Sequence, residues 1–241
     1  MEGPRPSQKP IPARERLIFA LDVASHDEAL AWVERLGDAV HFYKVGLELA
    51  LAGDLRALLS ELARRRKRVF ADLKLFDIPE TVAGAVRQLA KSGVDFATVH
   101  SGGGTVEAAC REKGGVAILA VTVLTSFDAG DLDEPGHPRS LEELVLARAR
   151  RALAQGADGL VASGLEAAAL RRALGSEFLI VSPGIRPAGA RSADDQKRVV
   201  DVAEAFRNGA DHIVVGRPIR HAADPRAAAA GIQATIASLF A

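Results

Sequence analysis

The sequence predicts an α/β protein of one domain, built as a closed (β/α)8 TIM barrel. Short apolar runs alternate with longer segments of helical periodicity along almost the whole chain, and eight such pairs follow one another. This alternation is typical of parallel strands joined by helices. The length of 241 residues suits one barrel and is long for a single open sheet.

Eight apolar runs are the expected strands, and a helical segment follows each. The expected strands cover residues 16–22, 40–46, 68–74, 94–100, 116–122, 158–163, 177–182 and 211–216. The expected helices cover residues 26–36, 54–66, 80–92, 104–112, 140–155, 165–174, 195–208 and 225–239. Residues 1–15 carry proline and charge and are expected to be a flexible extension, which leaves residues 16–241 as the catalytic domain.

Glycine and proline stand where helices are expected to end and begin. Gly-Ala-Asp occurs at 156–158 and again at 209–211, where glycine can end a helix before the next strand. Pro79 stands where a helix is expected to begin, a position that tolerates proline. An open doubly wound sheet is the main alternative, but it normally has a glycine fingerprint after its first strand. Here that strand ends in Leu21-Asp22-Val23, so the closed barrel is favoured.

Composition argues against several classes of protein. The formal net charge is zero, which gives no reason to expect binding to nucleic acid or to an anionic membrane. The chain has no apolar run of about eighteen residues, and its first residues lack the apolar segment of a secretory signal. The single cysteine, Cys110, allows no internal disulfide, and the histidines lack the spacing of metal ligands. We therefore expect a cytoplasmic protein with no disulfide and no metal site.

Polar side chains follow several of the expected strands. In a barrel of this kind the chemistry gathers at the carboxyl ends of the strands. A purely structural strand would stay apolar there, so these residues are candidates for a site. They are Asp22 at the end of the first strand, Lys44 at the end of the second, Asp72 and Lys74 at the end of the third, Thr125 and Ser126 after the fifth, Arg186 after the seventh, and Gly216 and Arg217 at the end of the eighth.

The densest group of charges is at the end of the third strand. Asp72 and Lys74 are two residues apart on a strand and are expected to share a face, whereas Asp77 lies in the turn that follows. Lys44 on the neighbouring strand would complete an alternating row of lysines and aspartates. A neutralised ion network at the barrel mouth is the structural alternative. Four converging charges beside Asp22 favour a functional role, since burying charge is costly.

A second group lies after the seventh and eighth strands, where barrels of this kind often bind phosphate at a helix start. It comprises Pro183-Gly-Ile-Arg186, a downstream Gln196, and Gly216-Arg217. Arg217 can bind a phosphate through two hydrogen bonds, and glycine lets the backbone approach closely. Either glycine alone could be only a turn, but the two motifs together predict a phosphate site.

These residues resemble those of the orotidine 5′-phosphate decarboxylase family of the bacterial type, from Ala20 to Ile219. The most specific motif is Asp72-x-Lys74-x-x-Asp77-Ile78-Pro79-x-Thr81. The supporting motifs are Lys44-Val-Gly46, Thr122-Val-Leu-Thr125-Ser126, Pro183-Gly-Ile-Arg186-Pro187 and Asp195-Gln196. The chain departs from the family pattern at Phe76, where histidine is expected, and at Glu80, where asparagine is common.

The resemblance implies that the chain decarboxylates orotidine 5′-monophosphate (OMP) to UMP, the last step of pyrimidine nucleotide synthesis, without a cofactor. Asp22 and Lys44 would hold the ribose hydroxyls. Asp72 would face the substrate carboxylate, and Lys74 would deliver the proton that replaces CO₂.

The resemblance also implies a homodimer with shared sites. Asp77, Ile78 and Thr81 would reach the neighbouring subunit's site. Thr125 and Ser126 would lie against the pyrimidine. The 5′-phosphate would be bound by residues of the last two loops, including Pro183, Arg186, Gln196, Gly216 and Arg217.

Two other functions remain in view. One is a related barrel enzyme that acts on sugar phosphates with Mg²⁺ and has a similar Asp-x-Lys-x-x-Asp motif, but Ile78-Pro79 and Gln196 argue against it. The other is an inactive barrel that serves as a binding module. It is disfavoured because every charged position of the motif is present.

Overall fold

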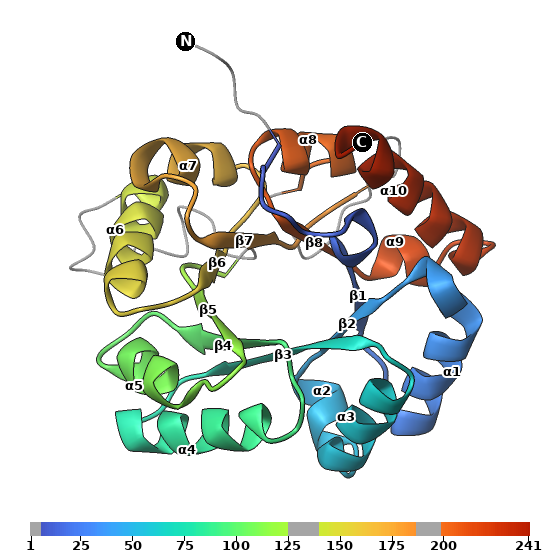
Figure 1. Ribbon diagram of the computed structural model, residues 1–241, viewed down its shortest axis with the longest axis horizontal. Coiled ribbons are helices and arrows are strands. Elements are labelled where there is room, and N and C mark those ends of the chain that lie inside the picture. Colours follow the sequence, from blue (N-terminus) through green and yellow to red (C-terminus); the bar gives the residue numbers. More distant parts are fainter. Residues whose placement is uncertain (1–5, 125–139, 187–198) are drawn as a thin grey trace.

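The eight expected strands form a closed parallel barrel in the computed structural model, which describes residues 6–124, 140–186 and 199–241 (Figure 1). Neighbours in sequence are neighbours in the barrel, and β1 pairs with β8 to close it. The strands are β1 (Leu17–Leu21), β2 (Phe42–Val45), β3 (Arg68–Leu75), β4 (Phe96–His100), β5 (Ala117–Val121), β6 (Gly159–Val161), β7 (Leu179–Ser182) and β8 (His212–Val215).

Helices surround the barrel on the outside, as Figure 1 shows. They are α1 (His26–Leu36), α2 (Leu47–Leu51), α3 (Leu55–Arg64), α4 (Pro79–Ala90), α5 (Thr105–Glu112), α6 (Leu141–Ala154), α7 (Ala167–Leu174), α8 (Val202–Arg207), α9 (Arg217–Arg220) and α10 (Pro225–Leu239). Two short 3-10 turns cover Ala13–Glu15 and Gly37–Ala39. Within the described ranges, no helix combines the length and the apolar character needed to cross a membrane.

The predicted helix at 195–208 is wrong at its start within the described residues. Val200 forms a parallel β-bridge with Ile185 and is therefore extended. Asp201 then caps α8, because its side chain accepts the backbone N–H of Glu204. Positions 195–198 lie outside the described residues. The short helices α2 and α9 were not predicted, since four or five residues are too few to show a helical period.

The inside of the barrel is a packed apolar core. Phe70 and Phe96 meet edge to face with their ring centroids 6.0 Å apart, and Phe42 lies 4.9 Å from Phe96. The buried ring of His212 packs edge to face against Phe42 and Phe96, and burial lowers the pKa of this histidine to about 4. Side chains therefore fill the interior of the barrel towards the amino-terminal ends of the strands. An open space can exist only at the carboxyl ends, the mouth of the barrel.

A repeated Gly-x-Asp motif closes the opposite, amino-terminal end of the barrel. Gly93, Gly156 and Gly209 each have positive φ at the end of a helix, as the sequence predicts for the last two. The aspartate two residues later accepts a backbone N–H of the preceding strand. The pairs are Asp95 with Val69, Asp158 with Ile118, and Asp211 with Ile180. The three aspartates thereby fix the amino-terminal ends of β3, β5 and β7 against their neighbouring strands.

The N-terminal segment lies against this same end. The ammonium of Lys9 is 3.4 Å from a carboxylate oxygen of Asp211. The Arg16 guanidinium is buried, donates to the carbonyl of Asp211 and stacks 3.6 Å from the ring centroid of Phe240. Lys9 and Arg16 thus hold this segment against the barrel. The expected flexibility of residues 1–15 stays a prediction.

Two glycines give a test of how tightly the barrel is packed. A Cβ at Gly159 on β6 would lie 2.6 Å from both the Cβ and the carbonyl oxygen of Leu179, whereas a Cβ at Gly231 on α10 would meet nothing within 4 Å. Gly159→Ala should lower the free energy of unfolding by about 1–3 kcal/mol through overpacking. Gly231→Ala should raise it by about 0.5–1 kcal/mol. Urea denaturation measures both, and equal effects of the two changes would contradict the packing argument.

Candidate active site

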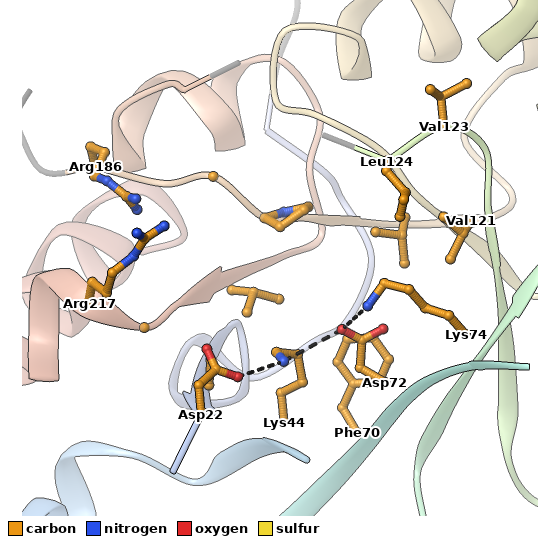
Figure 2. Close-up of a pocket in the computed structure, with 16 residues that line it drawn as sticks. Asp22, Lys44, Phe70, Asp72, Lys74, Val121, Val123, Leu124, Arg186 and Arg217 are labelled. Carbon is orange, nitrogen blue, oxygen red and sulfur yellow. Dashed lines mark hydrogen bonds and ion pairs between the residues drawn. The ribbon is translucent and has the colours of Figure 1, made fainter. Parts of the chain in front are cut away.

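A cavity of about 240 Å³ opens at the carboxyl ends of the strands. Figure 2 shows Arg186 and Arg217 at one end of it and Lys74 at the other, with Asp22, Lys44 and Asp72 between. The residues that line it come from seven of the eight strands or the loops that follow them. They are Ala20, Asp22, Lys44, Phe70, Asp72, Lys74, Val121, Val123, Leu124, Val161, Pro183, Gly184, Arg186, Val214, Gly216 and Arg217.

Four charged side chains form a continuous row along one side of this cavity. Lys44 Nζ lies 3.1 Å from Asp22 Oδ1 and 3.5 Å from Asp72 Oδ2. Lys74 Nζ lies 2.8 Å from the same Asp72 Oδ2. The order of charges is therefore Asp22, Lys44, Asp72, Lys74, which differs from the expected row because Asp22 takes the place of Asp77.

A break in the β3–β4 ladder places Lys74. Ala71 pairs with Ala97 and Leu75 pairs with Val99, so three residues of β3 stand opposite Thr98 alone. Lys74 has φ of +49°, a left-handed conformation that is uncommon for a residue with a side chain. Such a bulge redirects a side chain at the end of a strand. The regular strand expected from the sequence is therefore replaced by an irregular one, on which Asp72 and Lys74 still meet.

Thr98 links the two ends of this bulge. Its hydroxyl oxygen accepts the backbone N–H of Lys74 at 2.9 Å, and the hydroxyl donates to Asp72 Oδ1 at 3.0 Å. The side chain is fully buried. Asp72 therefore has one carboxylate oxygen on Thr98 and the other on the two lysines.

The row is buried enough for its charges to change one another's pKa. Burial alone would raise the pKa of Asp72, but Lys44, Lys74 and the Thr98 hydrogen bond outweigh burial and lower it. Burial alone would lower the pKa of Lys44, but Asp72 and Asp22 outweigh it and raise that pKa. Both groups are therefore held in their charged forms at neutral pH.

The other end of the cavity has two arginines and a close backbone. Arg217 begins α9, and Arg186 follows β7 with its side chain largely buried. Figure 2 shows both guanidinium groups at the same end of the cavity. A Cβ at Gly216 would lie 3.3 Å from the Cβ of Ala20, so a larger residue would crowd this end. Two guanidinium groups beside the backbone of a glycine can bind a phosphate.

Apolar side chains line the space between the two charged ends. Phe70 and Val214 belong to the apolar core inside the barrel, and Val121 and Val161 end β5 and β6. Figure 2 shows Leu124 above Phe70 and Val121. Apolar walls with a few converging polar groups are the usual form of a small-molecule site.

Some predicted site residues lie elsewhere in the described chain. Asp77 and Ile78 follow β3 and are exposed, and Thr81 is exposed on α4. The Asp77 carboxylate accepts the backbone N–H of Ile78 at 2.6 Å, and none of the three residues lines the cavity of their own chain. Thr125, Ser126 and Gln196 lie outside the described residues.

Sequence reasoning missed Thr98. The available signal was a hydroxyl in the middle of an otherwise apolar strand, Phe96-Ala-Thr-Val99. A polar residue at such a position must find a partner when it is buried. The partner could not be inferred, because the bulge opposite Thr98 has no signature in the sequence.

Fold and site together define a barrel enzyme for a small phosphorylated substrate, and comparison with known proteins identifies the family. Residues 15–232 match the family described as Orotidine 5′-phosphate decarboxylase / HUMPS. A protein of Methylococcus capsulatus named orotidine 5′-phosphate decarboxylase is 60% identical, over 98% of this chain and 97% of its own length. A protein of Xanthomonas oryzae pv. oryzae with the same name is 58% identical, over 94% of each chain.

A solved structure gives the same result. The crystal structure of orotidine 5′-phosphate decarboxylase from Lactobacillus acidophilus aligns with a TM-score of 0.81 at 35% identity, over 92% of this chain and 99% of that one. The chain therefore belongs to the orotidine 5′-phosphate decarboxylase / HUMPS family.

The lowered pKa of Asp72 predicts acid-sensitive stability. Because the folded pKa lies below the ordinary value of 3.8, the stabilisation from its ion pairs is complete above about pH 3.8 and is lost as the pH falls through the folded pKa. Urea denaturation at decreasing pH should therefore show the free energy of unfolding falling less steeply in Asp72→Asn than in the wild type. Asp27→Asn removes an exposed carboxylate on α1 and should follow the wild type. Identical slopes in wild type and Asp72→Asn would contradict the prediction.

Proposed function

We propose that this chain decarboxylates orotidine 5′-monophosphate to UMP and CO₂, with Lys74 as the proton donor. The membership of the family and the names of its relatives support the reaction. The observation that carries the assignment of roles is the row of charges, which places the Lys74 ammonium in the cavity opposite the two arginines. The predicted cytoplasmic location stays a prediction.

The chemistry needs a fixed positive charge. Loss of CO₂ from C6 of the pyrimidine leaves a carbanion in the plane of the ring, outside the π system. Such a charge is stabilised by groups that are already in place when it develops. An ammonium about 4 Å away contributes roughly 4 kcal/mol at an effective dielectric constant near 20. Lys74 would supply that charge and then its proton to C6.

The carboxylates of the row position the lysines. Asp72 accepts the Lys74 ammonium at 2.8 Å and lies 3.5 Å from that of Lys44, so both ammonium groups have a fixed direction. Asp72 would face the departing carboxylate, and Lys44 and Asp22 would hold the ribose hydroxyls. The described residues contain no cluster of three or more His, Cys, Asp or Glu side chains that could share a metal ion. On the resemblance of the motifs to the family, and not on that absence, we propose that the reaction requires no metal and no cofactor.

The arginine end of the cavity would bind the 5′-phosphate. Arg186, Arg217 and the backbone at Gly216 are the described groups for this role, with Pro183 beside them; Gln196 is assigned to the phosphate by resemblance, and Thr125 and Ser126 to the pyrimidine. Binding energy from a remote phosphate can be used to hold the ring against the charged row. The apolar walls between the two ends would exclude water from the developing carbanion.

Lys74→Ala should lower kcat for OMP by roughly 10²-fold or more, because general acid catalysis contributes 10²–10⁴-fold. Binding of UMP should be largely kept, since its phosphate contacts are at the other end of the cavity. The absorbance change on decarboxylation measures turnover, with and without a chelator. Lys91→Ala, an exposed lysine at the end of α4, is the control and should leave kcat unchanged.

Three results would count against this proposal. Retention of more than about a tenth of the wild-type rate by Lys74→Ala would exclude Lys74 as the proton donor. Loss of activity on addition of the chelator would favour the Mg²⁺-dependent enzymes of sugar phosphates. A wild-type protein without turnover would overturn the reaction itself.

We also propose a homodimer in which Asp77, Ile78 and Thr81 complete the partner's site. Large apolar side chains are exposed after neighbouring strands at the mouth of the barrel. They are Leu47 and Leu51 on α2, with exposed fractions of 57% and 84%, and Phe76 and Ile78 after β3, with 68% and 67%. Exposed apolar patches of this kind commonly mark an interface between proteins. The charged row also borders a second hollow beside α2, which a partner's side chains could fill.

A mixture of two inactive variants tests the shared site. When Lys74→Ala and Asp77→Ala subunits exchange at random, about half of the dimers are mixed, and one site of each mixed dimer regains both wild-type residues. About a quarter of all sites should therefore recover activity. If Asp77 acts within its own chain, every site keeps a lesion. A mixture that stays inactive, with exchange confirmed by tagged subunits, would refute the shared site.

A further inference from the structure

We infer that Thr98 is a positioning residue of this enzyme: its single hydroxyl fixes the Asp72 carboxylate and the left-handed backbone of Lys74 relative to each other. The inference rests on the proposed function for its link to catalysis. It does not require Thr98 to touch the substrate, because Thr98 is fully buried and does not line the cavity.

The first step of the argument is the hydrogen-bonding direction. The backbone N–H of Lys74 can only donate, so the Thr98 oxygen must accept from it. The only hydrogen of the hydroxyl is then left for Asp72 Oδ1, which is 3.0 Å away. The Lys74 N–H and the Asp72 carboxylate together thus determine the direction of the Thr98 O–H bond. The hydroxyl has no second orientation that makes both hydrogen bonds.

The second step is the geometry of the strand. Asp72, Leu73 and Lys74 stand opposite Thr98 alone, so the regular backbone ladder between β3 and β4 is interrupted there. The Thr98 hydroxyl supplies the acceptor that a backbone carbonyl would supply in a regular ladder. The left-handed conformation of Lys74, φ +49°, is unfavourable for a residue with a Cβ and needs such support.

The third step concerns charge. Asp72 Oδ2 accepts the Lys74 ammonium at 2.8 Å, while Oδ1 is held by Thr98. The carboxylate plane is thereby set by contacts on both oxygens, and the Lys74 side chain is held at its backbone end by Thr98 and at its ammonium end by Asp72. Without the hydroxyl, Asp72 can rotate and the Lys74 ammonium loses its fixed position in the cavity.

The test compares Thr98→Val, which keeps the shape of the side chain and removes the hydroxyl, with Thr98→Ser, which keeps the hydroxyl. Thr105→Val is the matched control. It removes another buried hydroxyl, whose hydrogen-bond partners among the described residues are the carbonyls of His100 and Gly102, neither of which belongs to the charged row. All three variants and the wild type are measured as purified full-length enzyme.

Thr98→Val should lower kcat roughly tenfold to a hundredfold, as expected for small misplacements of a catalytic group. KM for OMP and the affinity for UMP should change much less, because the arginine end is untouched. Thr98→Ser and Thr105→Val should keep kcat within about threefold of the wild type, a much smaller change than the loss caused by misplacing a catalytic group. Equal losses in Thr98→Val and Thr105→Val, or a loss in Thr98→Ser as large as in Thr98→Val, would overturn the inference.

A second readout is independent of turnover. Loss of the Thr98 hydrogen bond should raise the pKa of Asp72, which ¹³C NMR of the carboxyl group follows directly. An unchanged titration of Asp72 in Thr98→Val would also overturn the inference. If the wild type shows no decarboxylation, the proposed function fails, yet this titration still tests the link between Thr98 and Asp72. If Thr98→Val does not fold, Thr98→Cys replaces it, because its thiol is of similar size and forms only weak hydrogen bonds. A kcat and an Asp72 titration in Thr98→Cys that both match the wild type would equally overturn the inference.

Discussion

The Asp72 carboxylate accepts two different kinds of contact on its two oxygens, and the rest of the site depends on this division. Oδ2 lies between the ammonium groups of Lys44 and Lys74, and Oδ1 is bound by the Thr98 hydroxyl. A lone carboxylate buried to this degree would be driven towards its neutral form, whereas two lysines and a hydroxyl keep it charged. The same contacts direct two positive charges along the wall of the cavity, so one anion determines where both cations stand.

The two ends of the barrel divide stability from chemistry. At the amino-terminal end, carboxylates with the same role bind the N–H groups of the preceding strands, and Asp211 is joined there by Arg171 at 2.6 Å. Each of these carboxylates accepts a backbone N–H of a strand. At the carboxyl end, the carboxylates bind side-chain cations around an open cavity of about 240 Å³. Because strand pairing is regular at the amino-terminal end, the carboxyl end can contain a bulge and a lysine with left-handed backbone while the barrel stays closed.

The order of strands and helices could be predicted because it depends on periodicity, and the ends of α1 and α10 agree with the prediction residue for residue. The meeting of Lys44, Asp72 and Lys74 could be predicted as well, since strand ends of a barrel converge. The place of Asp22 in the row and the partner of Thr98 could not, because both depend on the register between strands and on a bulge that local sequence does not encode. The helix expected from 195 was too long for the same reason, since the extended backbone at Val200 arises from pairing with the distant Ile185.

The placement of charge in the cavity explains why its two ends must act together. The arginine end can bind a phosphate strongly, but a strong contact that is equal in the ground state and the transition state does not accelerate a reaction. The row from Asp22 to Lys74 can stabilise a developing carbanion, but only for a ring that is held at a fixed distance from Lys74. Apolar side chains line the cavity between the two ends, among them Phe70, Val121 and Leu124. In the proposed mechanism they would keep that distance and limit the access of water. In the proposed mechanism, binding energy from the phosphate would hold the reacting ring at a fixed position beside Lys74. The rigidity of the Asp72–Lys74–Thr98 unit would then determine how precisely the ammonium faces the reacting carbon.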